Sequence, residues 1–233
     1  VHVLHNLGVT FFQRAEFATA LEYFERAELE GSDVADQKWL ASLFAGMGMS
    51  RHEVGDFEGA IHYLRKSEAL FEAIRNRIRA AEIHFHTGRV LRAIGNRAKA
   101  DSVLTESEAA ARSAGNDVLA IRIGVFLCVC RAEDGQFEIA LRRLEELVIA
   151  ADEIDDVSVR YTARLGLARV LRQRDAGRAE AVLREAAAML EAVTDGRPLA
   201  DVYRELSEVL AQRGLAEEAL EYSNRAYAAL RQS

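Results

Sequence analysis

The sequence predicts an all-α protein in which antiparallel helix pairs stack on one another. Two observations predict it. The 233 residues include one Pro and 15 Gly. They are rich in Ala, Leu, Glu and Arg, side chains that lose little freedom in a helix. The second observation is a repeat of about 40 residues along the whole chain, which is typical of helical arrays.

Each repeat is marked by an alanine in its second helix, followed by aliphatic or aromatic side chains. These alanines are Ala20, Ala60, Ala100, Ala140, Ala179 and Ala219, evenly spaced except that the interval from Ala140 to Ala179 is one residue shorter than the others. Eleven or twelve residues earlier stands another small residue, namely Gly8, Gly48, Gly88, Cys128, Ala168 and Ser207. Small residues on both helices let the two backbones approach closely. We therefore expect a bulky side chain at Ala60 or Ala140 to cost about 1–3 kcal/mol.

Two kinds of break punctuate each repeat. Within a pair the turn carries glycine, at Gly55, Gly95, Gly135 and Gly214. Glycine is favoured there because the residue that ends a helix often adopts the left-handed conformation, which other residues adopt only at a cost. Between pairs, Ser32, Asp117 and Asp156 are predicted to cap the following helix, and Pro198 suits a first helical turn. The sequence therefore predicts six helix pairs in a single domain. Their bounds are about 1–31, 32–75, 76–115, 116–154, 155–196 and 197–233.

The first predicted helix is shorter than the later ones, for which we expect a start near Asp33 in the second repeat, and the chain does not begin with Met. We therefore expect the chain to be a piece of a longer protein.

The first repeat, "LHNLGVTFF…EFATALEYFERA", resembles the tetratricopeptide repeat in the long form of the family. The residues that carry the resemblance are Leu4, Leu7, Gly8, Phe11, Ala20, Phe24 and Ala27. Arg51, Arg131 and Leu147 depart from the pattern at equivalent positions of other repeats. The resemblance implies a right-handed superhelical solenoid of six antiparallel helix pairs, as found in bacterial helix-turn-helix regulators and signalling proteins.

Composition and motifs exclude several classes of function. The formal charge of −7 and pI of about 5.5 argue against direct nucleic-acid binding, and no apolar run reaches membrane-spanning length. The two cysteines, Cys128 and Cys130, indicate a reducing cytoplasm and point to different sides of one helix. His2 and His5 share a face without further ligands nearby. We expect no metal, no cofactor and no enzyme activity, since no nucleophile, acid and base group together.

The resemblance implies that positions 2, 5, 9 and 12 of each first helix line an inner, concave face. The predicted ligand residues there are His5, Phe12, Met49, His52, Phe85, Arg89, Arg92, Arg122, Arg169, Arg172 and Arg204. An apolar, histidine-containing zone is followed by an arginine-rich one. Guanidinium groups match carboxylates, so one hypothesis is an acidic extended peptide. The alternative is that these arginines are solvated and pair with glutamates of the same or the next helix.

The sequence thus predicts a noncatalytic module that binds a protein or peptide. We expect it to be the sensing or regulatory domain of a bacterial transcriptional regulator. A free-standing adaptor remains an alternative, as does the input domain of a signalling enzyme such as a diguanylate cyclase or a kinase. The terminal repeats would also allow a homodimer, because neither end carries an obvious polar capping helix.

Overall fold

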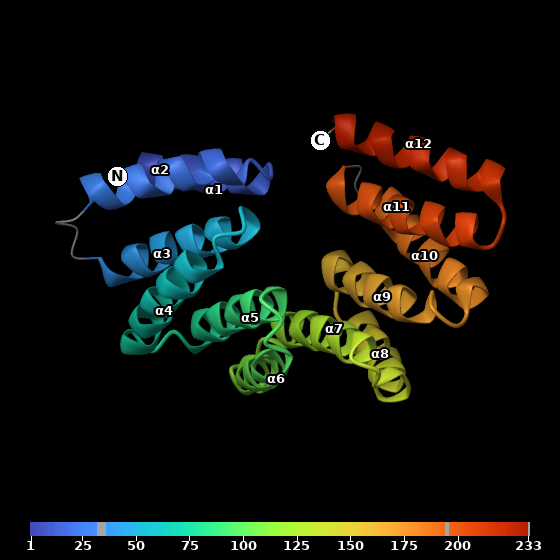
Figure 1. Cartoon of the computed structure of the whole chain (residues 1–233), viewed down its shortest axis with the longest axis horizontal. Coiled ribbons are helices and arrows are strands. Elements are labelled where there is room, and N and C mark those ends of the chain that lie inside the picture. The colour runs from blue at the N-terminus through green and yellow to red at the C-terminus, as the bar shows by residue number, and fades with distance from the viewer. Residues whose placement is uncertain (32–35, 194–195, 233) are drawn as a thin grey trace. The chain divides into compact units, whose positions relative to one another are not determined.

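Helix follows helix through the computed structural model, which describes residues 1–31, 36–193 and 196–232 (Figure 1). The described residues form helices and no strand, which confirms the all-α prediction. The helices are α1 (His2–Gln13), α2 (Phe17–Glu30), α3 (Gln37–Glu53), α4 (Phe57–Ala73), α5 (Arg77–Ala93), α6 (Arg97–Ser113), α7 (Asp117–Glu133), α8 (Phe137–Asp152), α9 (Val157–Leu171), α10 (Ala176–Glu191), α11 (Arg197–Gln212) and α12 (Ala216–Gln232). We call the odd-numbered helices A helices and the even-numbered ones B helices.

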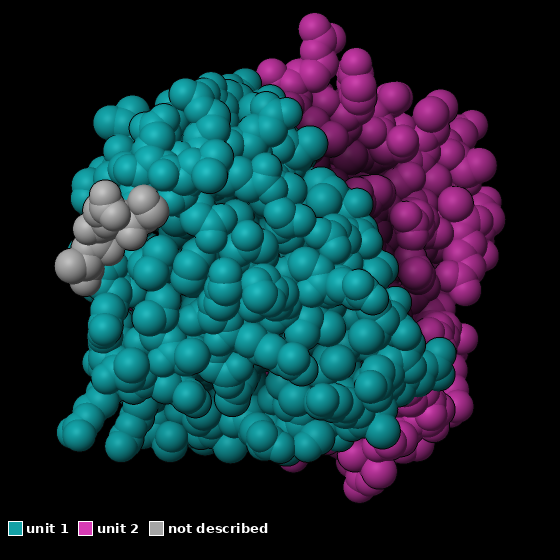
Figure 2. All heavy atoms as spheres, turned by 60° about the vertical axis from the view of Figure 1, so that its left-hand side comes forward, with its two compact units in different colours: residues 1–120 teal, residues 121–233 magenta. Residues whose placement is uncertain are grey.

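The chain divides into two compact units, residues 1–120 and 121–233, shown in two colours in Figure 2. In the first unit α1 packs on α2, α3 on α4 and α5 on α6, while α2 contacts α3 and α4 contacts α5. The A helices of this unit also meet directly, α1 with α3 and α3 with α5. In the second unit α8 contacts α9, α9 contacts α10, α10 contacts α11 and α11 contacts α12. Within each unit, consecutive helix pairs therefore bury their apolar faces against one another.

The small residues lie where the two helices of a pair cross. A methyl group at Gly88 would lie 2.6 Å from both Cγ and Cδ2 of Leu104, and one at Gly48 would lie 2.8 Å from Cγ of Leu64. The B-helix alanines are buried, with exposed fractions of 0% at Ala60 and 1% at Ala100. The backbones approach as closely as the sequence predicts.

The glycine turns are also confirmed. Gly55, Gly95, Gly135 and Gly214 have φ angles of 86°, 79°, 89° and 80°. Among the described residues, Ala15 with φ 58° and Arg75 with φ 55° adopt the same left-handed region without being glycine. One repeat after Arg75 the equivalent turn carries Gly115, with φ 73°. Arg75 thus holds a conformation that costs a non-glycine residue about 1–2 kcal/mol.

The helix caps are predicted in part. The carboxylate of Asp156 accepts hydrogen bonds from the backbone N–H groups of Ser158 and Val159 in the first turn of α9, and Pro198 lies in the first turn of α11. The prediction for Asp117 is wrong, because Asp117 is already the first residue of α7. The preceding Asn116 caps the helix by accepting the N–H of Leu119 at 2.9 Å. Ser32 and Asp33 lie outside the described residues.

Candidate binding surfaces on the A helices

All eleven predicted ligand residues keep part of their surface exposed. Arg122, Arg169 and Arg204 are exposed, and the other eight are half-buried. In the first unit these residues come from α1, α3 and α5. In the second unit they come from α7, α9 and α11, with Arg172 directly after the last residue of α9.

On α1 the residues predicted for the apolar, histidine-containing zone pack against the core of the first unit. The His5 ring lies 6.3 Å from that of Trp39, and the Phe12 ring lies 5.2 Å from that of Phe17. Burial lowers the pKa of His5 from its ordinary value, which favours the neutral ring. On α3, Met49 packs against a buried cluster that includes Leu64. These side chains are half-buried and pack against the core of the first unit.

A polar contact joins α3 to α5 next to that surface. Arg89 Nη2 donates to Glu53 Oε1 at 3.0 Å, and His52 Nδ1 lies 3.5 Å from the same carboxylate oxygen. Burial, followed by the positive charge of Arg89, lowers the pKa of His52. Phe85 packs on its neighbour His86 with ring centres 5.5 Å apart, and Arg92 lies in the last turn of α5.

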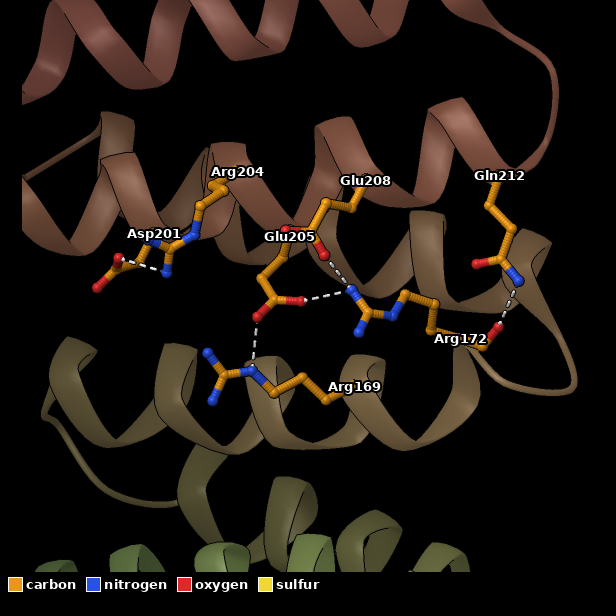
Figure 3. A network of polar contacts seen from close by, with 7 residues as sticks. All are labelled: Arg169, Arg172, Asp201, Arg204, Glu205, Glu208 and Gln212. Atoms are coloured by element: carbon orange, nitrogen blue, oxygen red, sulfur yellow. Dashed lines mark hydrogen bonds and ion pairs between the residues drawn. The ribbon is translucent and has the colours of Figure 1, made fainter. Parts of the chain in front are cut away.

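In the second unit two arginines share one glutamate (Figure 3). Arg169 Nε donates to Glu205 Oε1 at 2.7 Å, and Arg172 Nη1 donates to Glu205 Oε2 at 3.3 Å and also to Glu208. The Gln212 side chain donates to the Arg172 carbonyl oxygen at 3.3 Å. The Glu205 side chain is only 10% exposed, whereas that of Glu208 is 53% exposed. Glu205 is therefore a largely buried part of this surface, and Glu208 is an exposed part of it.

Arg204 and Arg122 complete the predicted set. Arg204 Nη2 donates to Asp201 at 3.0 Å within α11, with 60% of the arginine side chain exposed. Arg122 is exposed on α7. Four of these arginines, Arg89, Arg169, Arg172 and Arg204, form ion pairs with carboxylates. The surface is therefore less positive than the sequence positions of the inner face predict.

The acidic partners Glu53 and Glu205 were missed by the sequence reasoning, although a signal for them exists. Arg89 and Glu53 are 36 residues apart, as are Arg169 and Glu205. This offset is one repeat less one helical turn, which places two residues side by side on consecutive A helices. A search for opposite charges at that spacing would have found both pairs.

The histidine and cysteine pairs show no metal geometry. His2 and His5 both pack against Trp39, with ring centres 5.6 Å and 6.3 Å away. Across the described ranges no three His, Cys, Asp or Glu side chains gather as a metal site would require. Cys128 and Cys130 are buried thiols with exposed fractions of 2% and 7%, and Cys128 fills the small-residue position of its repeat.

Stacked antiparallel helix pairs, with small residues at each crossing, define a tetratricopeptide-like helical repeat protein. No protein-family profile matches the chain, and no curated protein matches it in sequence. Three similar solved structures share this class of fold. Aspartyl phosphate phosphatase F from Bacillus subtilis is 14% identical, with a TM-score of 0.73, covering 99% of this chain and 70% of that one.

The second is NprR in complex with its cognate peptide NprX, at 13% identity, a TM-score of 0.71, and coverage of 100% of this chain and 67% of that one. The third is the Rap conjugation gene regulator of plasmid pLS20 in complex with the Phr* peptide. It is 17% identical, with a TM-score of 0.67, covering 97% of this chain and 72% of that one. At this level of identity the likeness establishes the fold of the chain.

No helix among residues 1–31, 36–193 and 196–232 combines the length and the apolar character that crossing a membrane requires.

Proposed function

We propose that the chain is a noncatalytic module that binds a peptide, or an extended segment of a partner protein, on the exposed faces of its A helices. The observation that carries the proposal is the cluster in which Arg169 and Arg172 of one repeat meet Glu205 and Glu208 of the next. Side chains of consecutive A helices thus act on one surface, which an extended ligand can follow. The peptides bound to NprR and to the Rap regulator, which share the fold, support the same use here.

An acidic ligand suits this surface through exchange of partners. Arg172 is 34% exposed and its partner Glu208 is 53% exposed, so a ligand carboxylate can replace Glu208 without uncovering the core. Exchanging one exposed pair for another changes the free energy little, because such pairs contribute about 0–1 kcal/mol each. Affinity must then come from several contacts along the ligand, and it should fall as salt is added.

We further propose that the module is the sensing domain of a bacterial, cytoplasmic transcriptional regulator. The Rap protein of similar fold is named a regulator of conjugation genes, which supports this context. Sequencing the parent gene on both sides of the present chain tests it. A DNA-binding helix-turn-helix in the same reading frame is expected. A catalytic domain, or no further domain, would overturn the regulator role while leaving peptide binding to its own test.

Peptide binding is tested by selecting random displayed dodecapeptides on the purified chain and measuring Kd for the enriched ones by fluorescence anisotropy. Arg172→Gln should weaken acidic peptides by up to about fivefold, the equivalent of an exposed ion pair of about 1 kcal/mol. Glu208→Gln should tighten them, because it removes the exposed carboxylate that competes with the ligand for Arg172. Arg143→Gln, which removes an arginine paired with Glu146 on the B helix α8, is the matched control.

The neutral substitution is chosen because a charge reversal at Arg172 would face both Glu205 and Glu208 and would perturb the fold. No enriched peptide from a library of adequate size would refute peptide binding. Enriched peptides whose Kd is unchanged by Arg172→Gln and Glu208→Gln would refute this surface as the site.

A further inference from the structure

A cavity of about 480 Å³ opens in the first unit, and none of the eleven predicted ligand residues lines it. It lies between the end of α4, the start of α5 and the end of α6. Its lining includes Arg75, Arg77, Ala80, His84 and Ala110, with Glu72 at the edge of α4. A second hollow of about 600 Å³ shares Arg75 and Arg77 and extends around the turn between α4 and α5.

The repeat itself explains why this space is empty. One repeat earlier, the positions equivalent to Ala80, His84 and Ala110 hold Leu40, Phe44 and Leu70, which pack together in one hydrophobic cluster. Two leucines have thus become alanines and a phenylalanine has become the smaller histidine. Because unfilled space weakens a core, this truncation lowers stability without an evident structural gain.

The charges around the cavity are unbalanced. Neither Arg75 nor Arg77 has an ion-pair partner among the residues that the structure describes, in contrast to Arg89, Arg169 and Arg172. Glu72 contributes the one carboxylate of the lining. His84 is held by Glu68 on α4 and is therefore already paired. The two guanidinium groups thus face a partly apolar cavity with an excess of one positive charge.

We propose that this cavity binds a small organic monoanion, with an apolar body against Ala80, Ala81 and Ala110 and a carboxylate between Arg75 and Arg77. Guanidinium groups bind carboxylates through paired hydrogen bonds, and small-molecule sites have volumes of about 300–1,000 Å³. Glu72 disfavours a second negative charge on the ligand, so a phosphate dianion fits less well. The proposal does not depend on peptide binding by the A helices, because the two sites share no residue.

The test uses the full chain and three probes of one shape: naphthalene-2-carboxylate, the neutral 2-naphthylmethanol and the cationic 2-naphthylmethylammonium. Binding is followed by NMR of ¹³C-labelled alanine methyl groups. The carboxylate should shift the methyl signals of Ala80, Ala81 and Ala110, and should bind at least about tenfold more tightly than the neutral probe, as one charge-assisted contact allows. The cationic probe should not bind. Equal affinity for carboxylate and alcohol, or no shift at these methyl groups, would overturn the proposal.

Two sets of variants locate the site. Arg75→Gly combined with Arg77→Gln should weaken the carboxylate at least about tenfold. The glycine suits the left-handed backbone there, as Gly115 does one repeat on. Arg65→Gln, on the exposed side of α4, is the matched control and should change nothing.

Ala80→Leu combined with Ala110→Leu should fill the cavity as Leu40 and Leu70 do in the preceding repeat, and should abolish binding. Ala109→Leu, the same change at an exposed neighbour, should leave Kd unchanged. If the variant with both leucines does not fold, the Arg75→Gly and Arg77→Gln variant still tests whether the carboxylate binds in this cavity. Unchanged affinity in either variant would refute this location.

Discussion

Replacing Gly88 by Ala should destabilise the first unit, although alanine is the better helix former. Alanine gains about 0.5–1 kcal/mol over glycine within a helix. Its methyl group, however, would lie 2.6 Å from two carbons of Leu104, whereas carbon atoms pack best at about 3.5–4.0 Å. Leu104 is fully buried at 0% exposure, so its side chain can shift only by displacing other core residues. Overpacking costs about 1–3 kcal/mol, so we expect a net loss of about 1 kcal/mol once the gain from the better helix former is subtracted.

The assay is urea unfolding followed by circular dichroism at 222 nm, with Gly177→Ala as the matched control. At Gly177 the nearest atom to an added methyl is Asp175 Oδ1 at 3.7 Å, an ordinary contact, and the residue is exposed in the first turn of α10. There the same substitution should stabilise by about 0.5–1 kcal/mol. The reasoning is refuted if Gly88→Ala raises the midpoint as Gly177→Ala does, because the two helices would then have room to separate.

Three further changes test other contacts by the same assay. Ala15→Gly should raise the free energy of unfolding by about 0.5–1 kcal/mol. Ala15 has φ 58°, and glycine removes that strain, although the greater conformational freedom of glycine in the unfolded chain cancels part of the gain. A lower midpoint would contradict this. Ser67→Ala should cost about 1 kcal/mol, because the buried hydroxyl donates to the Ala41 carbonyl at 2.8 Å, and an unchanged midpoint would show the bond to be negligible. The hydrogen bond to Glu68 raises the pKa of His84 above 6.5. The stabilisation from this pair is fully present below pH 6.5 and is lost as the pH rises through the raised pKa of folded His84. Between about pH 6 and about pH 9 the free energy of unfolding should therefore fall more for the wild type than for Glu68→Gln.

The fold could be predicted because its determinants are local and recur. A glycine with positive φ at Gly55 or Gly95 ends a helix whatever lies beyond it. A small residue such as Gly88 is required wherever two backbones cross closely. The repeat multiplies each signal, so one ambiguous position is corrected by its equivalents in the other repeats.

The candidate surface could be predicted only in part, because its charges depend on pairs formed between repeats. The inner-face positions predict Arg169 and Arg172 but leave out Glu205, which lies one position after the predicted Arg204 on α11. A single helix face does not show that Glu205 reaches back to α9. The cap of α7 failed for a different reason, since Asn116 and Asp117 are both capping residues and only the backbone decides between neighbours.

The positions at which this chain departs from its repeat pattern hold polar side chains with specific partners. The position of Phe44 is held by His84, Arg164 and Tyr203 in later repeats, and each of these polar side chains has found a partner. Arg164, only 8% exposed, donates twice to Asp152 at 2.7 Å and 3.0 Å. A buried charge of this kind is retained only with such partners. Where the replacement is small and its neighbours are alanines, as at His84, the same departure leaves a cavity. The shared positions thus fix the fold, and these replacements are where binding functions can differ from one repeat to the next.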